Sequence, residues 1–222
     1  MTHRASRAVH AVLGLVVLAA FCAQVVLLLG GGADANSGQA EPVPVVARFV
    51  RFLSYFTSQS NLLVLLAAVS LVLDPARDGR LWRVVRLDAL LGITVTGLVF
   101  GAVLAPYVHP TGLAWWVNAG FHYVSPVLAV LSWVLFGPRP RIDGRTFAWA
   151  FAWPVGWTVI TLVRGSVTGW YPYPFLDAGA LGYGTALRNV GFVVLLSVAL
   201  LSLFRVLDHR LRPRPGAVAP RS

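Results

Sequence analysis

Two groups of polar residues interrupt apolar stretches of this 222-residue chain, and each group repeats at the spacing of one helix face. The first group lies at i, i+3, i+4 and i+7 and consists of Ser54, Thr57, Ser58 and Asn61. The second group consists of Asn118, His122, Ser125 and Ser132. A hydroxyl within hydrogen-bond reach of a neutral imidazole is the minimum arrangement for nucleophilic catalysis. The two faces therefore allow acyl transfer if the fold brings them together.

The elements that carry these faces are predicted to be membrane-spanning helices. Hydrophobic residues make up 57% of the chain and charged residues 12%, about half the charge of a soluble domain. A transmembrane helix needs about 20 mostly apolar residues. Six stretches meet this requirement: 9–29, 45–73, 84–105, 113–136, 146–163 and 185–207. We therefore expect an all-α fold, a single integral membrane bundle of six helices over residues 1–210, followed by a disordered cytoplasmic tail at 211–222.

The distribution of arginine predicts the orientation of this bundle. All 18 basic residues are Arg, and in an alternating six-helix arrangement 14 of them lie on the side of the two termini. Positive residues in short loops mark the cytoplasmic side, so both termini are expected in the cytoplasm and the protein in the plasma (cell) membrane. The net charge of +10 is thereby explained by topology and by contact with anionic lipid headgroups. It does not indicate a nucleic-acid partner.

The start of the chain has a second interpretation. Arg4 and Arg7, an apolar run and the sequence ADA at 33–35 are also typical of a secretory signal with a cleavage site. The apolar run of about 20 residues is longer than the core of such a signal. We therefore expect a retained first helix.

Metal and cofactor chemistry have no sequence support. Cys22 is the only cysteine and Glu41 the only glutamate, and no His-Glu-x-x-His spacing occurs. We expect no metal, no cofactor and no paired-carboxylate glycosidase chemistry.

Counting from the starts of their stretches, Thr57 and His122 should lie at similar depth. Both predicted helices enter from the outer side, and both residues lie about 13–18 Å below that boundary at 1.5 Å per residue. Ser and Thr also join membrane helices without any chemistry, and a lone His can serve only as a structural hydrogen-bond partner. Spacing and depth leave both interpretations open.

The last outer loop, 164–184, contains two Tyr-Pro pairs, which favour extended backbone. Trp170 and Tyr171 are typical of an aromatic anchor at the membrane interface. The loop can instead cover the outer mouth of the bundle, with Asp177 or Arg164 reaching the polar cluster. In that case Asp177 would orient His122, as the third member of a catalytic triad does.

Three segments resemble the androgen-induced and androgen-dependent-regulator family of multi-pass membrane proteins. They are VTGWYPYPFLD at 167–177, WVNAGFH at 116–122 followed by Pro126, and RFLSYFT at 51–57 followed by NLL at 61–63. The likeness extends over nearly the whole chain. Animal members are intramembrane threonine hydrolases that cleave fatty acid esters of hydroxy fatty acids. The resemblance implies a Thr nucleophile on an early helix and a His on a later one.

The family histidine corresponds to His122, whereas two residues match the family nucleophile. An ungapped match through Phe52 places it on Ser54, and a match through Tyr55 places it on Thr57, with Asn61 four residues later against three in the family. We favour Thr57, because the residue type is kept and its expected depth is closer to that of His122.

The sequence thus predicts a lipid acyl-ester hydrolase that uses Thr57, or else Ser54, with His122 as the base. Ser58, Asn61 or Asn118 would stabilise the oxyanion. The expected partners are membrane lipids, including an acyl-ester substrate. The alternative is a non-catalytic membrane protein or a small-molecule carrier, although we find neither an inverted repeat nor broken helices typical of carriers.

Overall fold

The computed structural model describes residues 2–211 and is built from helices. About 79% of the chain is helical, and the described residues contain no strand. Within residues 2–211, six helical segments are long and apolar enough to cross a membrane: His3–Leu29, Phe56–Leu73, Arg80–Tyr107, Gly112–Phe136, Gly144–Thr168 and Tyr183–Arg210. The predicted all-helical, multi-pass fold is confirmed in this form. The predicted tail, except for its first residue, lies outside the described residues.

The helices follow the chain as α1 (Thr2–Leu29), α2 (Val45–Ser54), α3 (Phe56–Leu73), α4 (Arg80–Val99), α5 (Gly112–Ala119), α6 (Ser125–Phe136), α7 (Gly144–Trp149), α8 (Ala152–Thr168), α9 (Ala178–Leu181) and α10 (Tyr183–Arg210). Two π-helical turns extend them: η1 (Phe100–Leu104) after α4, and η3 (Gly120–Val124), which joins α5 to α6. Two 3₁₀ turns are η2 (Ala105–Tyr107) and η4 (Pro174–Leu176).

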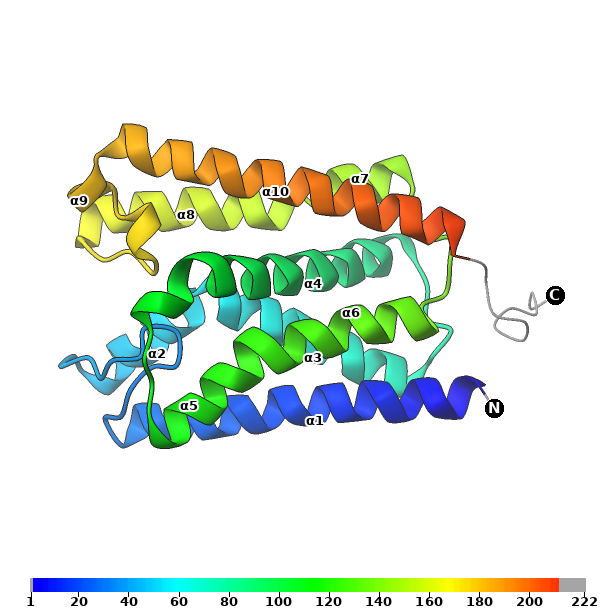
Figure 1. Ribbon diagram of the computed structural model, residues 1–222, viewed down its shortest axis with the longest axis horizontal. Coiled ribbons are helices and arrows are strands. Elements are labelled where there is room, and N and C mark those ends of the chain that lie inside the picture. Colours follow the sequence, from blue (N-terminus) through cyan, green and yellow to red (C-terminus); the bar gives the residue numbers. More distant parts are fainter. Residues whose placement is uncertain (1, 212–222) are drawn as a thin grey trace.

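The long helices run side by side, with α1 on one side of the molecule and α8 and α10 on the other (Figure 1). Between them lie α3, α4 and α6; α3 packs against both α1 and α4, and α6 packs against the same two helices. The described chain enters and leaves at the same end of the bundle, which we call the terminal end (Figure 1). The opposite end carries α2, α9 and the loop 30–44, and we call it the loop end. Because this end is predicted to lie on the outer side, we call the loop 30–44 the first outer loop.

The predicted continuous helix over 45–73 is wrong. Tyr55 has an extended backbone, with φ −66° and ψ 136°, and separates α2 from α3. Only α3 is long and apolar enough to span a membrane. The depth expected for Thr57, which was counted from residue 45, therefore does not hold: Thr57 is the second residue of the spanning helix.

The fifth apolar stretch is also interrupted, because α7 ends at Trp149 and α8 begins at Ala152. Pro154 lies in the first turn of α8, where a missing backbone N–H costs nothing. Pro154 therefore lies at the start of α8 and does not bend a longer helix.

Candidate active site

Thr57 lies in the first turn of α3 because the helix is interrupted at Tyr55. The backbone N–H groups in the first turn of a helix have no partner within that helix. The N–H of Thr57 donates instead to the phenol oxygen of Tyr173, 3.1 Å away. This contact fixes the first turn of α3 against the last outer loop.

His122 lies opposite, in the middle of the π-helical turn η3. Phe100, from the π-helical turn η1, stacks on its ring with 3.8 Å between centroids and 19° between planes. Single π-helical turns within α-helices frequently occur at functional sites. Here the two turns face each other, and the His122 side chain is fully buried between them at 2% exposure.

The hydrogen bonds of His122 determine which ring nitrogen carries the proton. Its Nδ1 lies 3.2 Å from the backbone oxygen of Asn118, which can only accept, so Nδ1 carries the hydrogen. In the neutral ring Nε2 is then an acceptor. The Oγ1 of Thr57 lies 3.4 Å from Nε2 and donates to it. The Thr57 hydroxyl therefore points its proton at an imidazole nitrogen that can take it.

Tyr173 is a site residue that the sequence analysis missed. Its phenol oxygen lies 3.2 Å from Thr57 Oγ1 and donates to it when Thr57 donates to His122. Burial raises the pKa of Tyr173 to about 12, so the phenol stays protonated at neutral pH. Its position in the second Tyr-Pro pair of the last outer loop was the available signal. That loop therefore does reach the polar cluster, through Tyr173.

The predicted oxyanion groups have other partners. The side-chain nitrogen of Asn61 donates to the backbone oxygens of Thr57, at 3.0 Å, and Phe121, at 3.3 Å. That of Asn118 donates to the backbone oxygen of Ala35 at 2.8 Å. The Ser58 hydroxyl is buried and has no hydrogen-bond partner among residues 2–211. The Asn61 amide thus joins α3 to η3, and the Asn118 amide joins α5 to the first outer loop.

Ser54, the other nucleophile candidate, is not brought to His122. Its hydroxyl donates to the backbone oxygen of Val50 and accepts from Arg164. The Arg164 guanidinium also lies over the Trp170 ring, 4.7 Å from its centroid, and Arg51 lies 5.2 Å from the same ring. Because the backbone turns at Tyr55, the predicted shared face of Ser54 and Thr57 does not form.

Asp177 does not act on His122 in the structure. Its carboxylate accepts from the backbone N–H of Ala180, 3.0 Å away, and caps the short helix α9. The group that orients the imidazole is the backbone oxygen of Asn118. The predicted triad role of Asp177 is therefore taken by a main-chain group.

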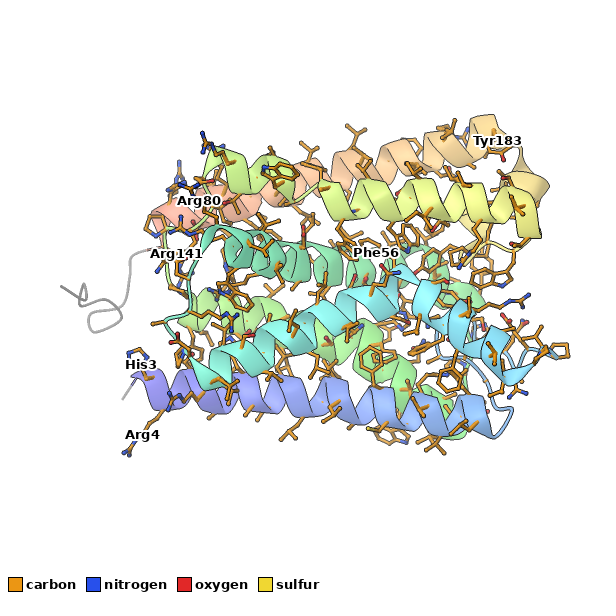
Figure 2. The ribbon with its side chains drawn as sticks, turned by 180° about the vertical axis from the view of Figure 1, so that it is seen from behind. His3, Arg4, Phe56, Arg80, Arg141 and Tyr183 are labelled. Carbon is orange, nitrogen blue, oxygen red and sulfur yellow. The ribbon has the colours of Figure 1, made fainter. Side chains whose placement is uncertain are left out.

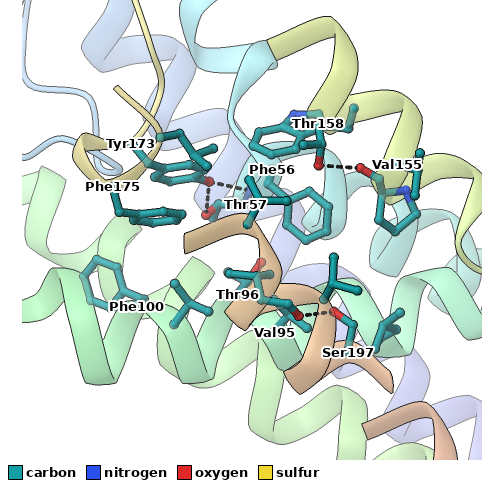
Figure 3. A pocket seen from close by; sticks show the side chains of 18 of the residues that line it. Phe56, Thr57, Val95, Thr96, Phe100, Val155, Thr158, Tyr173, Phe175 and Ser197 are labelled. Atoms are coloured by element: carbon teal, nitrogen blue, oxygen red, sulfur yellow. Dashed lines mark hydrogen bonds between the residues drawn. The ribbon is translucent and has the colours of Figure 1, made fainter. Parts of the chain in front are cut away.

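An apolar cavity of about 210 Å³ lies next to Thr57 (Figure 3). Its walls come from α3, α4, η1, α8, η4 and α10 and from Tyr173 just before η4. They include Thr57, Phe100, Trp157, Tyr173 and Phe175. Thr158 and Ser197 also face it, but their hydroxyls donate to backbone oxygens of their own helices, both at 2.8 Å. Thr96 lines the cavity as well, and its buried hydroxyl has no hydrogen-bond partner within residues 2–211. The pair of Thr57 and Tyr173 is distinguished by its contact with an imidazole, which the Thr57 hydroxyl makes.

The cavity reaches the outer surface of the bundle between α8 and α10. Val155 and Val159 of α8 and Val194 of α10 line it, and they are 52%, 55% and 42% exposed. Both helices belong to segments that are long and apolar enough to span a membrane, so in a bilayer this opening would lie beside hydrocarbon chains. His122 does not line the cavity; it lies behind Thr57.

The first outer loop covers the site from the loop end and contains a buried acid, Asp34. Burial raises the pKa of its carboxyl to about 6, although the backbone and side-chain N–H groups of Asn36 donate to it at 2.8 Å. The folded state therefore binds this proton more tightly than the unfolded chain, whose carboxyl has a pKa of 3.8.

We expect the stabilising contribution of protonated Asp34 to be complete below about pH 4 and to be lost as the pH rises to about 6. Asp34→Asn keeps the oxygen that accepts from Asn36 but cannot ionise. In detergent, the melting temperature of Asp34→Asn should exceed that of the wild type at pH 7, and the difference should shrink at pH 4.5. The carboxylate of Asp74 also accepts a hydrogen bond from a backbone N–H two residues later, that of Ala76 at 3.0 Å, but Asp74 is exposed. Asp74→Asn is the control, and an equal pH dependence in both variants would contradict the role of burial.

The described residues contain no group of three or more His, Cys, Asp or Glu side chains placed to hold a metal ion. No protein-family model, no curated protein and no solved structure matches the chain. The chemistry of the site must therefore be inferred from its geometry.

Proposed function

We propose that the protein is an intramembrane lipid ester hydrolase, located in the cell membrane with both termini in the cytoplasm. The observation that carries this proposal is the position of the Thr57 hydroxyl. It lies in the wall of an apolar cavity and 3.4 Å from an unprotonated imidazole nitrogen. Catalytic hydrogen bonds are often this long before substrate binds, and they shorten in the complex. The resemblance of three segments to a family of intramembrane threonine hydrolases points to the same chemistry.

The reaction begins with an ester carbonyl held next to Thr57. The Thr57 oxygen forms a bond to the carbonyl carbon while Nε2 of His122 takes the hydroxyl proton. The imidazolium then gives this proton to the departing alcohol as the carbon–oxygen bond to the alcohol breaks. Water then attacks the acyl-threonine while His122 takes its proton. The bond between the acyl carbon and the Thr57 oxygen breaks, His122 returns the proton to that oxygen, and the fatty acid leaves.

Tyr173 is the group we assign to the oxyanion. It lines the cavity beside Thr57, and its proton stays on the phenol because its pKa is raised to about 12. Once Thr57 has given its oxygen to the new bond, the Tyr173 O–H is free to donate to the negative carbonyl oxygen. One such donor is worth about 3 kcal/mol of transition-state stabilisation.

The proposal is tested with a long-chain fluorophosphonate probe on the purified protein. The probe places phosphorus where the ester carbonyl would lie, with its alkyl chain in the cavity. We expect the wild type and Ser54→Ala to be labelled, because Ser54 bonds to Arg164 and Val50 and not to His122. Thr57→Ala should lose labelling. Labelling that persists in Thr57→Ala, with a melting temperature like that of the wild type, would contradict the proposal.

A further inference from the structure

A second, charged pocket lies at the terminal end of the bundle, far along α4 from the candidate active site. It is formed by the beginning of α4, the connection between α6 and α7, and the end of α10, and its volume is about 20 Å³. Figure 2 shows Arg80 and Arg141 at this end, beside the end of the described chain. The polar side chains that line the pocket are Arg77, Asp78, Trp82, Arg83, Arg86, Arg141 and Asp208.

Two of these arginines are already paired with carboxylates. Arg83 donates twice to Asp78, both times at 2.8 Å, and Arg141 forms an ion pair with the same carboxylate. Asp208 accepts from the backbone N–H groups of Arg141 and Ile142 through its Oδ2 atom, at 2.5 and 2.8 Å. These contacts form the walls of the pocket, and other polar groups that line it have no hydrogen-bond partner within residues 2–211.

The unused groups are mainly donors. Arg86, which is partly buried, makes no hydrogen bond and no ion pair within 4 Å with any residue between 2 and 211, although the charge of Asp208 attracts it from a greater distance. The indole N–H of Trp82 is buried and has no acceptor in the described chain. A buried donor without a partner costs about 1–3 kcal/mol, and a charged one costs more. The pocket therefore has two donors, the Arg86 guanidinium and the Trp82 indole, that a ligand with a negatively charged acceptor could use.

One acceptor in the pocket is also unused. The Oδ1 atom of Asp208 is buried and has no hydrogen-bond donor within residues 2–211. A bare inorganic anion would lie next to this carboxylate without compensation. A ligand that carries both a negative group and a hydroxyl would satisfy Arg86 and Trp82 with the first and Asp208 with the second.

Beyond Arg86 the pocket continues into apolar space. Arg86, Leu90 and Trp133 line both the charged pocket and an adjoining apolar pocket of about 40 Å³ between α3, α4 and α6. His10 lines that apolar pocket and also an open groove of about 280 Å³ between α1 and α3. Charge at one end and apolar space beside it match the shape of a lipid with its headgroup at the end of the bundle.

We propose that this pocket binds a phospholipid with an anionic, hydroxyl-bearing headgroup, such as phosphatidylglycerol. The phosphate accepts from Arg86 and from the Trp82 indole, and a headgroup hydroxyl donates to Asp208. Basic pockets between membrane helices on the cytoplasmic side are known to take anionic headgroups. Arginine suits phosphate, because its planar guanidinium can donate two parallel hydrogen bonds. This site is independent of the proposed hydrolase chemistry.

The test is titration of the purified protein in a neutral detergent with short-chain phosphatidylglycerol, followed by native mass spectrometry. We expect saturable binding of one lipid to the wild type. Arg86→Gln should weaken it by about tenfold or more, because a charge-assisted hydrogen bond is lost. Trp82→Phe keeps most of the apolar body of the side chain and should weaken it less. Arg145→Gln, at an exposed arginine of the same end that does not line the pocket, is the control and should bind like the wild type.

Three outcomes would overturn this proposal. Equal binding to wild type and Arg86→Gln would show that the lipid is held elsewhere. Equal binding of phosphatidylcholine, which has the same chains and phosphate but a choline headgroup, would exclude selection by charge and hydroxyl. Displacement of the lipid by millimolar inorganic phosphate would show that the pocket is a site for free phosphate. Because binding is measured without turnover, each result stands whether or not the protein hydrolyses esters.

Discussion

Replacing His122 with Gln is expected to lower the rate constant of ester hydrolysis, kcat, by about 10²- to 10⁴-fold, the usual contribution of a general base. Glutamine is close in size to histidine but cannot take the Thr57 proton. The Michaelis constant, KM, should change little, because His122 lies behind Thr57 and does not line the cavity that would hold the acyl chain. A residue that only supported the fold would not separate kcat from KM in this way.

The measurement is hydrolysis of a long-chain p-nitrophenyl ester by the purified protein, with the melting temperature recorded alongside. His109→Gln is the matched control, because His109 is an exposed histidine of the loop before α5 and should leave kcat unchanged. A His122→Gln protein that is folded and within threefold of the wild-type rate, while Thr57→Ala is inactive, would show that the imidazole is not the base.

The number of spanning helices could be predicted because the hydrocarbon interior of a membrane permits few backbone conformations. Backbone groups in the membrane interior must be satisfied within a helix, so long apolar stretches map directly onto helices. A hydroxyl from the second apolar stretch does lie near the imidazole of the fourth, as predicted, although the backbone turns at Tyr55 and the first polar face does not form as a whole. Polar side chains at such positions turn toward the interior of the bundle.

The interruption at Tyr55 could not be predicted, because its causes are distant in sequence. A continuous helix would join the N–H of Thr57 to the oxygen of Leu53 and the N–H of Ser58 to the oxygen of Ser54. Instead, Tyr173 accepts from the N–H of Thr57 at 3.1 Å, and the Trp157 indole donates to the oxygen of Ser54 at 2.9 Å. Both partners lie more than a hundred positions away, and the local sequence has neither Gly nor Pro.

The partner of His122 was missed for a different reason. A sequence identifies side chains only, and Asp177 was therefore predicted to orient the imidazole. The structure uses a backbone oxygen, that of Asn118, which lies four residues before His122. Every residue carries such a group, and only the geometry of the π-helical turn shows which one is used.

The position of Tyr173 also depends on the close packing of Gly165 against its neighbour Tyr171, which a methyl group at position 165 would prevent. Gly165 of α8 is buried beneath the ring of Tyr171, in the last outer loop. A Cβ at position 165 would lie 2.1 Å from Cε1, 2.4 Å from Cζ and 2.5 Å from Cδ1 of that ring. These distances are far below van der Waals contact, so the ring must move. Since Pro172 joins Tyr171 stiffly to Tyr173, the loop should move with it.

We therefore expect Gly165→Ala to lower the free energy of unfolding by about 1–3 kcal/mol, the usual cost of overpacking. It should also reduce kcat by at least about tenfold, because the Tyr173 hydroxyl is drawn away from Thr57 and from the oxyanion. The measurements are thermal unfolding in detergent and the ester assay described above for His122.

Gly156→Ala separates this effect from the helix propensity of alanine. Gly156 lies in the same helix, and a Cβ there would meet no atom within 4 Å. Alanine in the interior of a helix is more favourable than glycine by about 1 kcal/mol, so Gly156→Ala should be as stable as the wild type or more so, and fully active. If Gly165→Ala behaved like Gly156→Ala, Tyr171 could leave its place without disturbing Tyr173. The last outer loop would then not hold the oxyanion donor in position, and the rate contribution assigned to Tyr173 would have to come from another group in the cavity wall.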